Sequence, residues 1–320
     1  MAITLKQLAE LSGVSIRTVS RVLKNQAHVQ EEKRERILQL AKQYHYAPNM
    51  AARNLRLKQS RFVGILCSDA PYEIFHQKLQ DLENKLESEG YYPIMACSNG
   101  SEEQIERILS DWAGLVDFVV VSLFESSLPL KILPGLFRRY SMTPIYVDQE
   151  EDLPGHALSI CRTTGIRDAI SVLIRMKKKK ILWCGELLSR ENGLLQAFAE
   201  TPPEIHPELI RIRKTGTFEN GKILAEEILA TGADAVFFDT DKMALGFLNY
   251  AAEHAIRVPE QISVIGFDDD VSGSIVYPSL STVAHPTDEL NRTILSIIEE
   301  KPEKPVRKEF QTRFIRRKSC

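Results

Sequence analysis

From residue 61 to its end, the chain alternates short apolar segments with longer amphipathic ones. Short, continuously apolar segments are typical of strands covered on both faces. The amphipathic segments have the spacing of helices that cover such a sheet. The alternation therefore predicts an α/β fold with parallel sheets, and a ligand in the crevice at the carboxyl ends of the strands.

The apolar pattern also places the individual elements of this region. Strands are expected at Phe62–Cys67, Tyr92–Ala96, Phe118–Ser122, Ile145–Val147, Leu158–Cys161, Ile181–Cys184, Leu209–Ile212, Ala235–Phe238 and Ser263–Phe267, with a last strand in Phe310–Cys320. Helices are expected at Glu73–Glu89, Glu102–Trp112, Ile166–Met176, Glu219–Ala230 and Lys242–His254. Nine or ten strands suit two Rossmann-like subdomains.

Residues 4–23 show two short helical patterns on either side of a turn at Gly13. Their apolar residues can form one small core, which would contain Leu5, Leu8, Ala9, Val14, Val19, Val22 and Leu23. Ser15, Arg17, Thr18 and Arg21 are then expected to face outward. Donors on the outer face of the second helix are typical of a helix-turn-helix that enters a DNA major groove.

A third helical pattern, Glu31–His45, closes this unit, with Ile37, Leu38, Ala41 and Tyr44 expected to point inward. Residues 1–47 are therefore predicted to be an all-α DNA-binding domain. The charge agrees: residues 1–60 carry eleven Lys or Arg and four Glu, which is +7, so the rest of the chain carries −9. We call residues 1–60 the head and residues 61–320 the body. A basic head followed by an acidic body points to nucleic acid as the partner of the head only.

Residues 48–60 are predicted to be a linker. Pro48 disfavours helix at Ala47, and Asn49–Leu57 could form a short helix with Asn49 as its N-cap. Because such a helix is too short to be stable alone, we expect it to order when the protein docks on its partner.

No apolar run has the length of a membrane span, and the N-terminus lacks the apolar region of a signal peptide. The five cysteines are scattered and form no Cys-x-x-Cys pair. Reduced thiols in a cytoplasm fit this usage better than a disulfide framework or a metal site.

Several motifs, in order along the whole chain, carry a family resemblance. They are Gly13-Val14-Ser15 with Thr18–Leu23, Tyr46-Ala47-Pro48-Asn49 with Ala52 and Leu55, Asp241–Ala244, Ile262–Asp269 and Pro278–Val283. The sequence resembles the lactose/galactose repressor family of bacterial transcription regulators. The resemblance implies a body of two interleaved α/β subdomains at residues 61–320, similar to periplasmic binding proteins, that binds an effector and dimerises.

The resemblance also implies a DNA-binding set. Ile16, Arg17 and Arg21 would touch base edges, and Leu55 would wedge between base steps of the minor groove. Phosphate contacts would position the head. The full predicted set is Thr4, Ser15, Ile16, Arg17, Thr18, Ser20, Arg21, Asn49, Ala52, Arg53 and Leu55.

For the effector, the resemblance implies that Arg190 and Asp268 face each other across the crevice and bind hydroxyls. The alternative is that these two residues form a salt bridge between the subdomains. The remaining predicted effector residues are Tyr72, Phe75, Phe218, Thr240 and His285, of which the aromatic ones could equally be core residues.

Five positions depart from the common family pattern. Thr240, His285 and the Cys161-Arg162 pair leave the class of effector open. Lys24 and Gln30 also differ, but they leave the prediction of DNA binding intact.

The expected function is that of a homodimeric repressor that binds a pseudo-palindromic operator. An inducing sugar is the expected effector, and a purine-type corepressor is the alternative. The chain shows no leucine-heptad tail, so a dimer is favoured over a tetramer. A solute-binding protein would match the body alone, but the DNA-binding head argues against export.

An enzyme is not expected, because no catalytic constellation is visible. The sequence Gly216–Lys222 is similar to a phosphate-binding P-loop. A P-loop has Ser or Thr after its lysine, and Ile223 at this position lacks the hydroxyl that binds Mg²⁺. The run Asp268–Asp270 suggests a metal site, yet consecutive residues of an extended chain cannot all face one ion. The sequence therefore predicts no cofactor and no metal.

Overall fold

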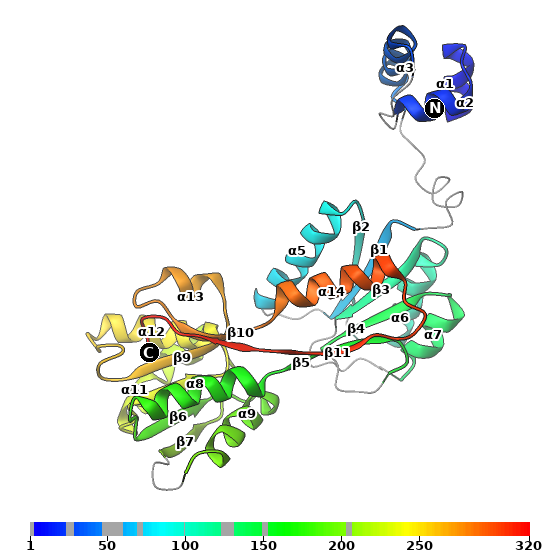
Figure 1. Cartoon of the computed structure of the whole chain (residues 1–320). Helices are drawn as coiled ribbons and strands as arrows, with labels where there is room; N and C mark the ends of the chain where they lie inside the picture. The colour runs from blue at the N-terminus through cyan, green and yellow to red at the C-terminus, as the bar shows by residue number, and fades with distance from the viewer. Residues whose placement is uncertain are drawn as a thin grey trace. The chain divides into compact units, whose positions relative to one another are not determined.

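The computed structural model describes residues 3–23, 29–46, 60–68, 73–98, 100–122, 131–148, 153–202 and 207–320. The chain divides into two compact units, Met1–Arg61 and Phe62–Cys320 (Figure 1). None of the helices in the described part of the chain combines the length and apolarity needed to span a bilayer. All five cysteines are free thiols.

The described residues of the first unit form three helices, which are α1 (Leu5–Ser12), α2 (Ile16–Leu23) and α3 (Glu31–Gln43). Gly13 ends α1 in the left-handed conformation, with φ +67°, and its N–H bonds the carbonyl groups of Ala9 and Glu10. This turn brings Leu8, Val19 and Ile37 into one buried core. The predicted helix-turn-helix and its core are confirmed.

One detail of the predicted core is wrong. Leu38 and Tyr44 are exposed, at 43% and 38% of their surface. Leu40 packs against the core instead, together with the correctly predicted Ala41, because these residues follow Ile37 by three and four positions and therefore share its face of the helix.

The second unit contains two six-stranded sheets, each with helices on both faces. The first sheet has the order β11-β5-β4-β3-β1-β2, and all of its strands are parallel. Its strands are β1 (Phe62–Ser68), β2 (Tyr92–Ser98), β3 (Val116–Ser122), β4 (Thr143–Val147), β5 (His156–Cys161) and β11 (Arg307–Gln311). Helices α5 (Glu73–Ser88) and α14 (Thr287–Glu300) lie side by side on one face, and α6 (Glu102–Trp112) and α7 (Leu133–Arg139) cover the other (Figure 1).

The second sheet has the order β12-β10-β9-β8-β6-β7, and only β12 is antiparallel. Its strands are β6 (Lys180–Cys184), β7 (Glu208–Ile212), β8 (Ala235–Phe238), β9 (Ser263–Asp268), β10 (Ser281–Ala284) and β12 (Arg313–Ile315). One face is covered by α8 (Thr163–Arg175) and α9 (Leu188–Ala199). The other face is covered by α11 (Ala225–Ala230) and α12 (Asp241–Glu253), next to which lies α10 (Phe218–Ile223), and the short α13 (Val271–Ile275) follows β9.

We call residues 62–161 and 287–311 the first lobe, and residues 163–284 and 313–320 the second lobe. The chain passes between the lobes three times: after β5, after β10 and after β11. Thr312 links two of these passages, because its hydroxyl lies 3.0 Å from the carbonyl oxygen of Cys161 and 3.1 Å from that of Arg162. The predicted architecture of two interleaved α/β subdomains is confirmed.

All nine predicted strands are present, but the C-terminal region differs from the prediction. The expected last strand is two short strands, β11 and β12, which belong to different sheets. The helix expected at Glu219–Ala230 is interrupted at Leu224, which separates α10 from α11. These elements are only three to six residues long, too short for a periodic apolar pattern to identify them.

Candidate functional site

The outer face of α2 is the candidate DNA-binding surface. Ile16 is 44% exposed, and Arg17 and Arg21 are exposed beside it. An exposed apolar residue beside two exposed guanidinium groups can contact a thymine methyl and guanine edges in a major groove. Ser20, on the same helix, is partly buried.

Ser15 and Thr4 have a structural task that sequence reasoning did not assign to them. The Ser15 hydroxyl accepts the Thr18 N–H at 3.1 Å and lies 2.9 Å from the Thr18 hydroxyl, so it caps the start of α2. Thr4 forms a capping box with Gln7 at the start of α1. Four predicted DNA contacts, namely Asn49, Ala52, Arg53 and Leu55, lie outside the described residues.

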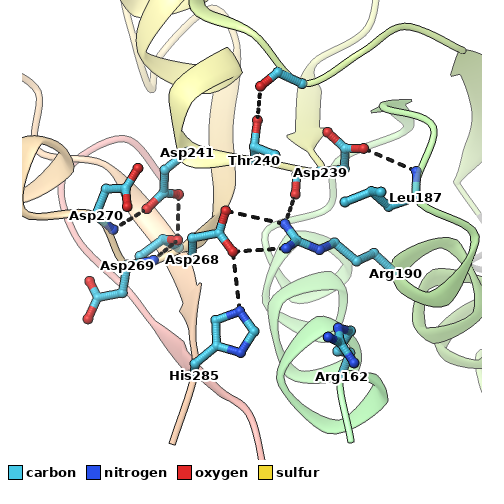
Figure 2. A network of polar contacts seen from close by, with 12 residues as sticks. Arg162, Leu187, Arg190, Asp239, Thr240, Asp241, Asp268, Asp269, Asp270 and His285 are labelled. Atoms are coloured by element: carbon cyan, nitrogen blue, oxygen red, sulfur yellow. Dashed lines mark hydrogen bonds and ion pairs between the residues drawn. The ribbon is translucent and has the colours of Figure 1, made fainter. Parts of the chain in front are cut away.

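Arg190 and Asp268 meet in the second lobe, at the carboxyl ends of its strands (Figure 2). Arg190 Nη2 lies 2.9 Å from Asp268 Oδ1, and its Nη1 lies 3.4 Å from Oδ2. Arg190 also donates to the backbone carbonyl of Asp239 and lies 4.0 Å above the ring of Phe267. Both members of the pair belong to the second lobe, so they form a buried ion pair within one subdomain rather than between two.

His285 completes this cluster. Its Nε2 lies 3.2 Å from Asp268 Oδ1, and its ring packs edge-on against Phe267. Burial lowers the pKa of His285 to about 4, although Asp268 partly opposes the shift, so the imidazole is neutral near pH 7. Burial alone would raise the pKa of Asp268, but the charge of Arg190 and the His285 hydrogen bond hold it below its ordinary value.

The three consecutive aspartates do not converge on one point. Asp268 contacts Arg190, whereas Asp269 lies 2.6 Å from Arg317 Nη2. The N–H of Asp270 bonds the Asp241 carboxylate at 2.8 Å (Figure 2). Within the described ranges, no group of three His, Cys, Asp or Glu side chains could hold a metal ion.

The backbone of Asp268 and Asp269 is strained. Asp268 has φ +123° and Asp269 has φ +62°, values that residues with a side chain rarely adopt. Strain of this kind concentrates at functional sites, where the surrounding contacts enforce it.

Thr240 is the N-cap of α12. Its hydroxyl accepts the Met243 N–H at 3.2 Å and donates to the Gly216 carbonyl at 3.0 Å. The adjacent Asp241 accepts bonds from Asp270 and from the Thr282 hydroxyl. Burial raises the pKa of Asp241 well above its ordinary value. The hydroxyl of Thr240 is therefore occupied by backbone contacts.

Asp239, at the end of β8, is a buried carboxylate that sequence reasoning missed. It accepts the N–H groups of Glu186 and Leu187 at 2.8 and 3.2 Å. Burial nevertheless raises its pKa to about 6. A methyl group at Gly185 would lie 2.1 Å from the Asp239 carboxyl carbon, so only glycine leaves room for this acid.

The remaining predicted effector residues are placed only in part. Phe218 is the first residue of α10 and is partly buried. Tyr72 and the side chain of Phe75 lie outside the described residues. The P-loop-like segment around Phe218 serves helix packing, because a Cβ at Gly221 would lie 1.9 Å from the Met243 carbonyl oxygen.

The first lobe contributes a cavity at the carboxyl ends of β3 and β4, between α5 and α14. Its volume is about 560 Å³, including its open mouth. Apolar side chains make up more than half of its lining. Its five polar lining residues, which we call the rim residues, are Lys78, Ser122, Asp148, Thr287 and Asn291. Sequence reasoning missed all of the rim residues, although Ser122 and Asp148 directly end or follow predicted strands.

Asp148, one of the rim residues, is paired with Arg162. Two bonds of 2.5 and 3.0 Å join the carboxylate to the guanidinium. Burial raises the pKa of Asp148, but Arg162, with smaller contributions from Lys78 and His285, outweighs this effect and holds the pKa below its ordinary value. Arg162, at a position where the common family pattern differs, is therefore the ion-pair partner of a carboxylate that lines the cavity.

Two family models match this chain. The model of bacterial regulatory proteins of the lacI family matches residues 4–49, and the model of the periplasmic binding protein-like domain matches residues 179–320.

Relatives match over nearly the full length. The ribose operon repressor of Bacillus subtilis is 27% identical over 99% of this chain and 98% of its own. The PurR repressor of Erwinia tasmaniensis is 28% identical over 92% of this chain and 89% of its own. The fold is similar to that of a Lac repressor dimer crystallised with operator and an anti-inducer, with a TM-score of 0.78 at 22% identity over 100% of this chain and 99% of the other. The two relatives are named as repressors, and this chain carries a DNA-binding region of the lacI type followed by a periplasmic binding protein-like domain.

Proposed function

We propose that the protein is a cytoplasmic, homodimeric repressor whose affinity for its operator is controlled by a small molecule bound in the body. The observation that carries the proposal is the outer face of α2, where Ile16, Arg17 and Arg21 are exposed in a region that matches the lacI-family model. Two heads related by a two-fold axis would bind the half-sites of a pseudo-palindromic operator.

In this proposal the residues of the head have different tasks. Ile16, Arg17 and Arg21 select the sequence, while hydroxyl groups such as that of Ser20 bind phosphates. Thr4 and Ser15 fix the helix ends that present these groups. Leu55 inserts into the minor groove and stabilises a bent duplex.

The effector would bind where the carboxyl ends of the strands of the two lobes face each other. Support comes from electrostatics: the charges of Asp268 and Arg190 in the second lobe shift the pKa of Lys78 in the first. A related protein is named a ribose operon repressor, and another is the PurR repressor. A sugar-like inducer is therefore our first candidate, and a purine-type corepressor is the second.

Control would act through the three chain passages between the lobes. A ligand that contacts both lobes favours one degree of closure of the lobes on each other. This closure would change the positions of the linkers of the two protomers, and with them the positions of the heads. Effector and operator affinities are then thermodynamically coupled, and each ligand changes the affinity for the other by the same factor.

A gel-shift experiment with the DNA upstream of the gene tests this function. We expect retardation that falls steeply with salt, because Lys and Arg displace counterions from phosphates. Sugars and purines added at constant ionic strength should change the retardation. Retardation equal to that of scrambled DNA would contradict the proposal.

A further inference from the structure

We propose that the effector carries an anionic group and that the ammonium group of Lys78 binds it. The inference deepens the proposed function and rests on it, since it names the chemical class of the small molecule. The ligand would be a compact, hydroxylated molecule with a phosphoryl or carboxyl group, such as a sugar phosphate or a sugar acid.

The position of Lys78 is the first argument. It lies on α5, it is one of the rim residues of the first-lobe cavity, and it is partly buried. A cation in such a place normally has a carboxylate partner, because removing charge from water is costly. Throughout the described part of the chain, no residue forms a hydrogen bond or an ion pair with Lys78.

The second argument is that the nearby carboxylates are already engaged. Asp148 is bound by two bonds to Arg162. Asp268 is bound to Arg190 and to His285, which is neutral. Each described carboxylate that acts on Lys78 thus has its own arginine, so within the described residues the positive charge of Lys78 is in surplus.

The protonation state of Lys78 supports the same conclusion. Burial lowers its pKa to about 8, although Asp148 and Asp268 partly oppose the shift. The amine is therefore still mostly protonated near pH 7, and a bound anion would raise this pKa again.

The rest of the cavity indicates what the anion is attached to. Ser122, Thr287 and Asn291 line the same cavity as Lys78, and they can exchange hydrogen bonds with hydroxyl groups. Leu82 and Ile294, also in the lining, are apolar and suit the C–H face of a sugar-like skeleton. A neutral sugar would bond these polar groups but would give Lys78 no counter-charge beyond what the described residues supply.

The test measures the melting temperature of the full chain with matched probes. Glucose is compared with glucose 6-phosphate and glucuronate, and ribose with ribose 5-phosphate, with sodium chloride added to equalise ionic strength. Inorganic phosphate is a further probe. We expect at least one acidic probe to raise Tm while its neutral counterpart does not. The phosphate and carboxylate arms distinguish the two sources of charge.

Three variants assign the effect to Lys78. In Lys78→Met the affinity for the stabilising acid should fall about 10- to 100-fold, which is typical for loss of a hydrogen bond between charged groups. Lys78→Arg keeps the charge and should retain most of the affinity. Lys304→Met removes an exposed lysine elsewhere in the first lobe and should behave like the unmodified chain.

The outcomes separate this inference from the function on which it rests. It is wrong if no acidic probe raises Tm, if neutral and acidic counterparts stabilise equally, or if Lys78→Met retains the response. In each of these cases the gel shift with upstream DNA can still succeed, so the repressor function would survive with a neutral effector. Failure of the gel shift contradicts the repressor function itself.

Discussion

Nη2 of Arg190 lies 2.9 Å from Oδ1 of Asp268, and the two side chains are only 2% and 5% exposed. The pair is further enclosed by the ring of Phe267 and by His285. A ligand that binds here must therefore meet groups that already neutralise each other. The second lobe thus presents a buried pair of opposite charges, whereas the first-lobe cavity is lined by Lys78, a cation that has no ion-pair partner among the described residues.

Removal of one member of this pair should destabilise the body strongly. Arg190→Met leaves the Asp268 carboxylate buried without its main partner, and such a loss costs about 3–5 kcal/mol. We expect a clear fall in Tm, measured by thermal unfolding near pH 7. Lys222→Met is the control, because its ion pair with Glu253 is largely exposed and contributes at most about 1 kcal/mol. Equal effects of the two substitutions would show that the buried pair is not structurally important.

His285 and Asp239 should give the body opposing responses to pH. The folded pKa of His285 is about 4, below its ordinary 6.5, so the unfolded chain binds more protons between these values and stability rises with pH. The folded pKa of Asp239 is about 6, above its ordinary 3.8, so its contribution to stability falls as pH rises through that range. In the unmodified chain the two trends largely cancel.

His285→Gln removes one of the two trends. The stability of the unmodified chain relative to this variant should increase from pH 4 to pH 6.5, by about 3 kcal/mol in total. Melting curves at several pH values in this window measure the difference. A difference that stays constant with pH would mean that His285 keeps an ordinary pKa in the folded protein.

Thr240 should matter for stability through its hydroxyl. Thr240→Ala removes the N-cap of α12 and the bond to Gly216, and we expect a loss of about 1–2 kcal/mol. Thr240→Ser keeps the hydroxyl and should lose much less. Thermal unfolding without added ligand gives the Tm of both variants. Equal losses of stability in Thr240→Ala and Thr240→Ser would show that the methyl group, which both variants lack, matters and that the hydroxyl cap does not.

Arg17 should determine sequence choice. Arg17→Ala is expected to weaken operator binding by about 1–3 kcal/mol and to relax discrimination at one base pair. Lys33→Ala, at an exposed position in the first turn of α3, should not change discrimination. Competition gel shifts with singly substituted operators measure both variants. Unchanged discrimination in Arg17→Ala would place the base contacts elsewhere on the head.

Leu55 should distinguish specific from non-specific binding. If it wedges into the minor groove, Leu55→Ala weakens binding to the operator far more than binding to scrambled DNA, because only the bent operator uses the wedge. Binding titrations on both DNAs give the ratio. Equal losses on the two DNAs would count against the wedge.

Local sequence patterns were sufficient for the elements of this fold but not for its site. Gly13 and the spacing of Leu8, Val19 and Val22 encode the head, since they act within one or two helical turns. The strand alternation encodes the sheets in the same way. The surroundings of Lys78 and Asp148 depend on α14, which lies about 140 residues or more further along the chain. Thr240 was read as a ligand contact, although its position before α12 is that of an N-cap.

The three passages of the chain between the lobes also limit how genes for such proteins can recombine. Each lobe is assembled from two separate stretches of sequence, so one recombination junction inside the body always leaves a lobe of mixed parentage. Only a junction near residue 61 exchanges intact parts. New pairings of operator and effector are therefore expected to arise by exchange of whole heads, and new effector preferences by point substitutions around the cavity.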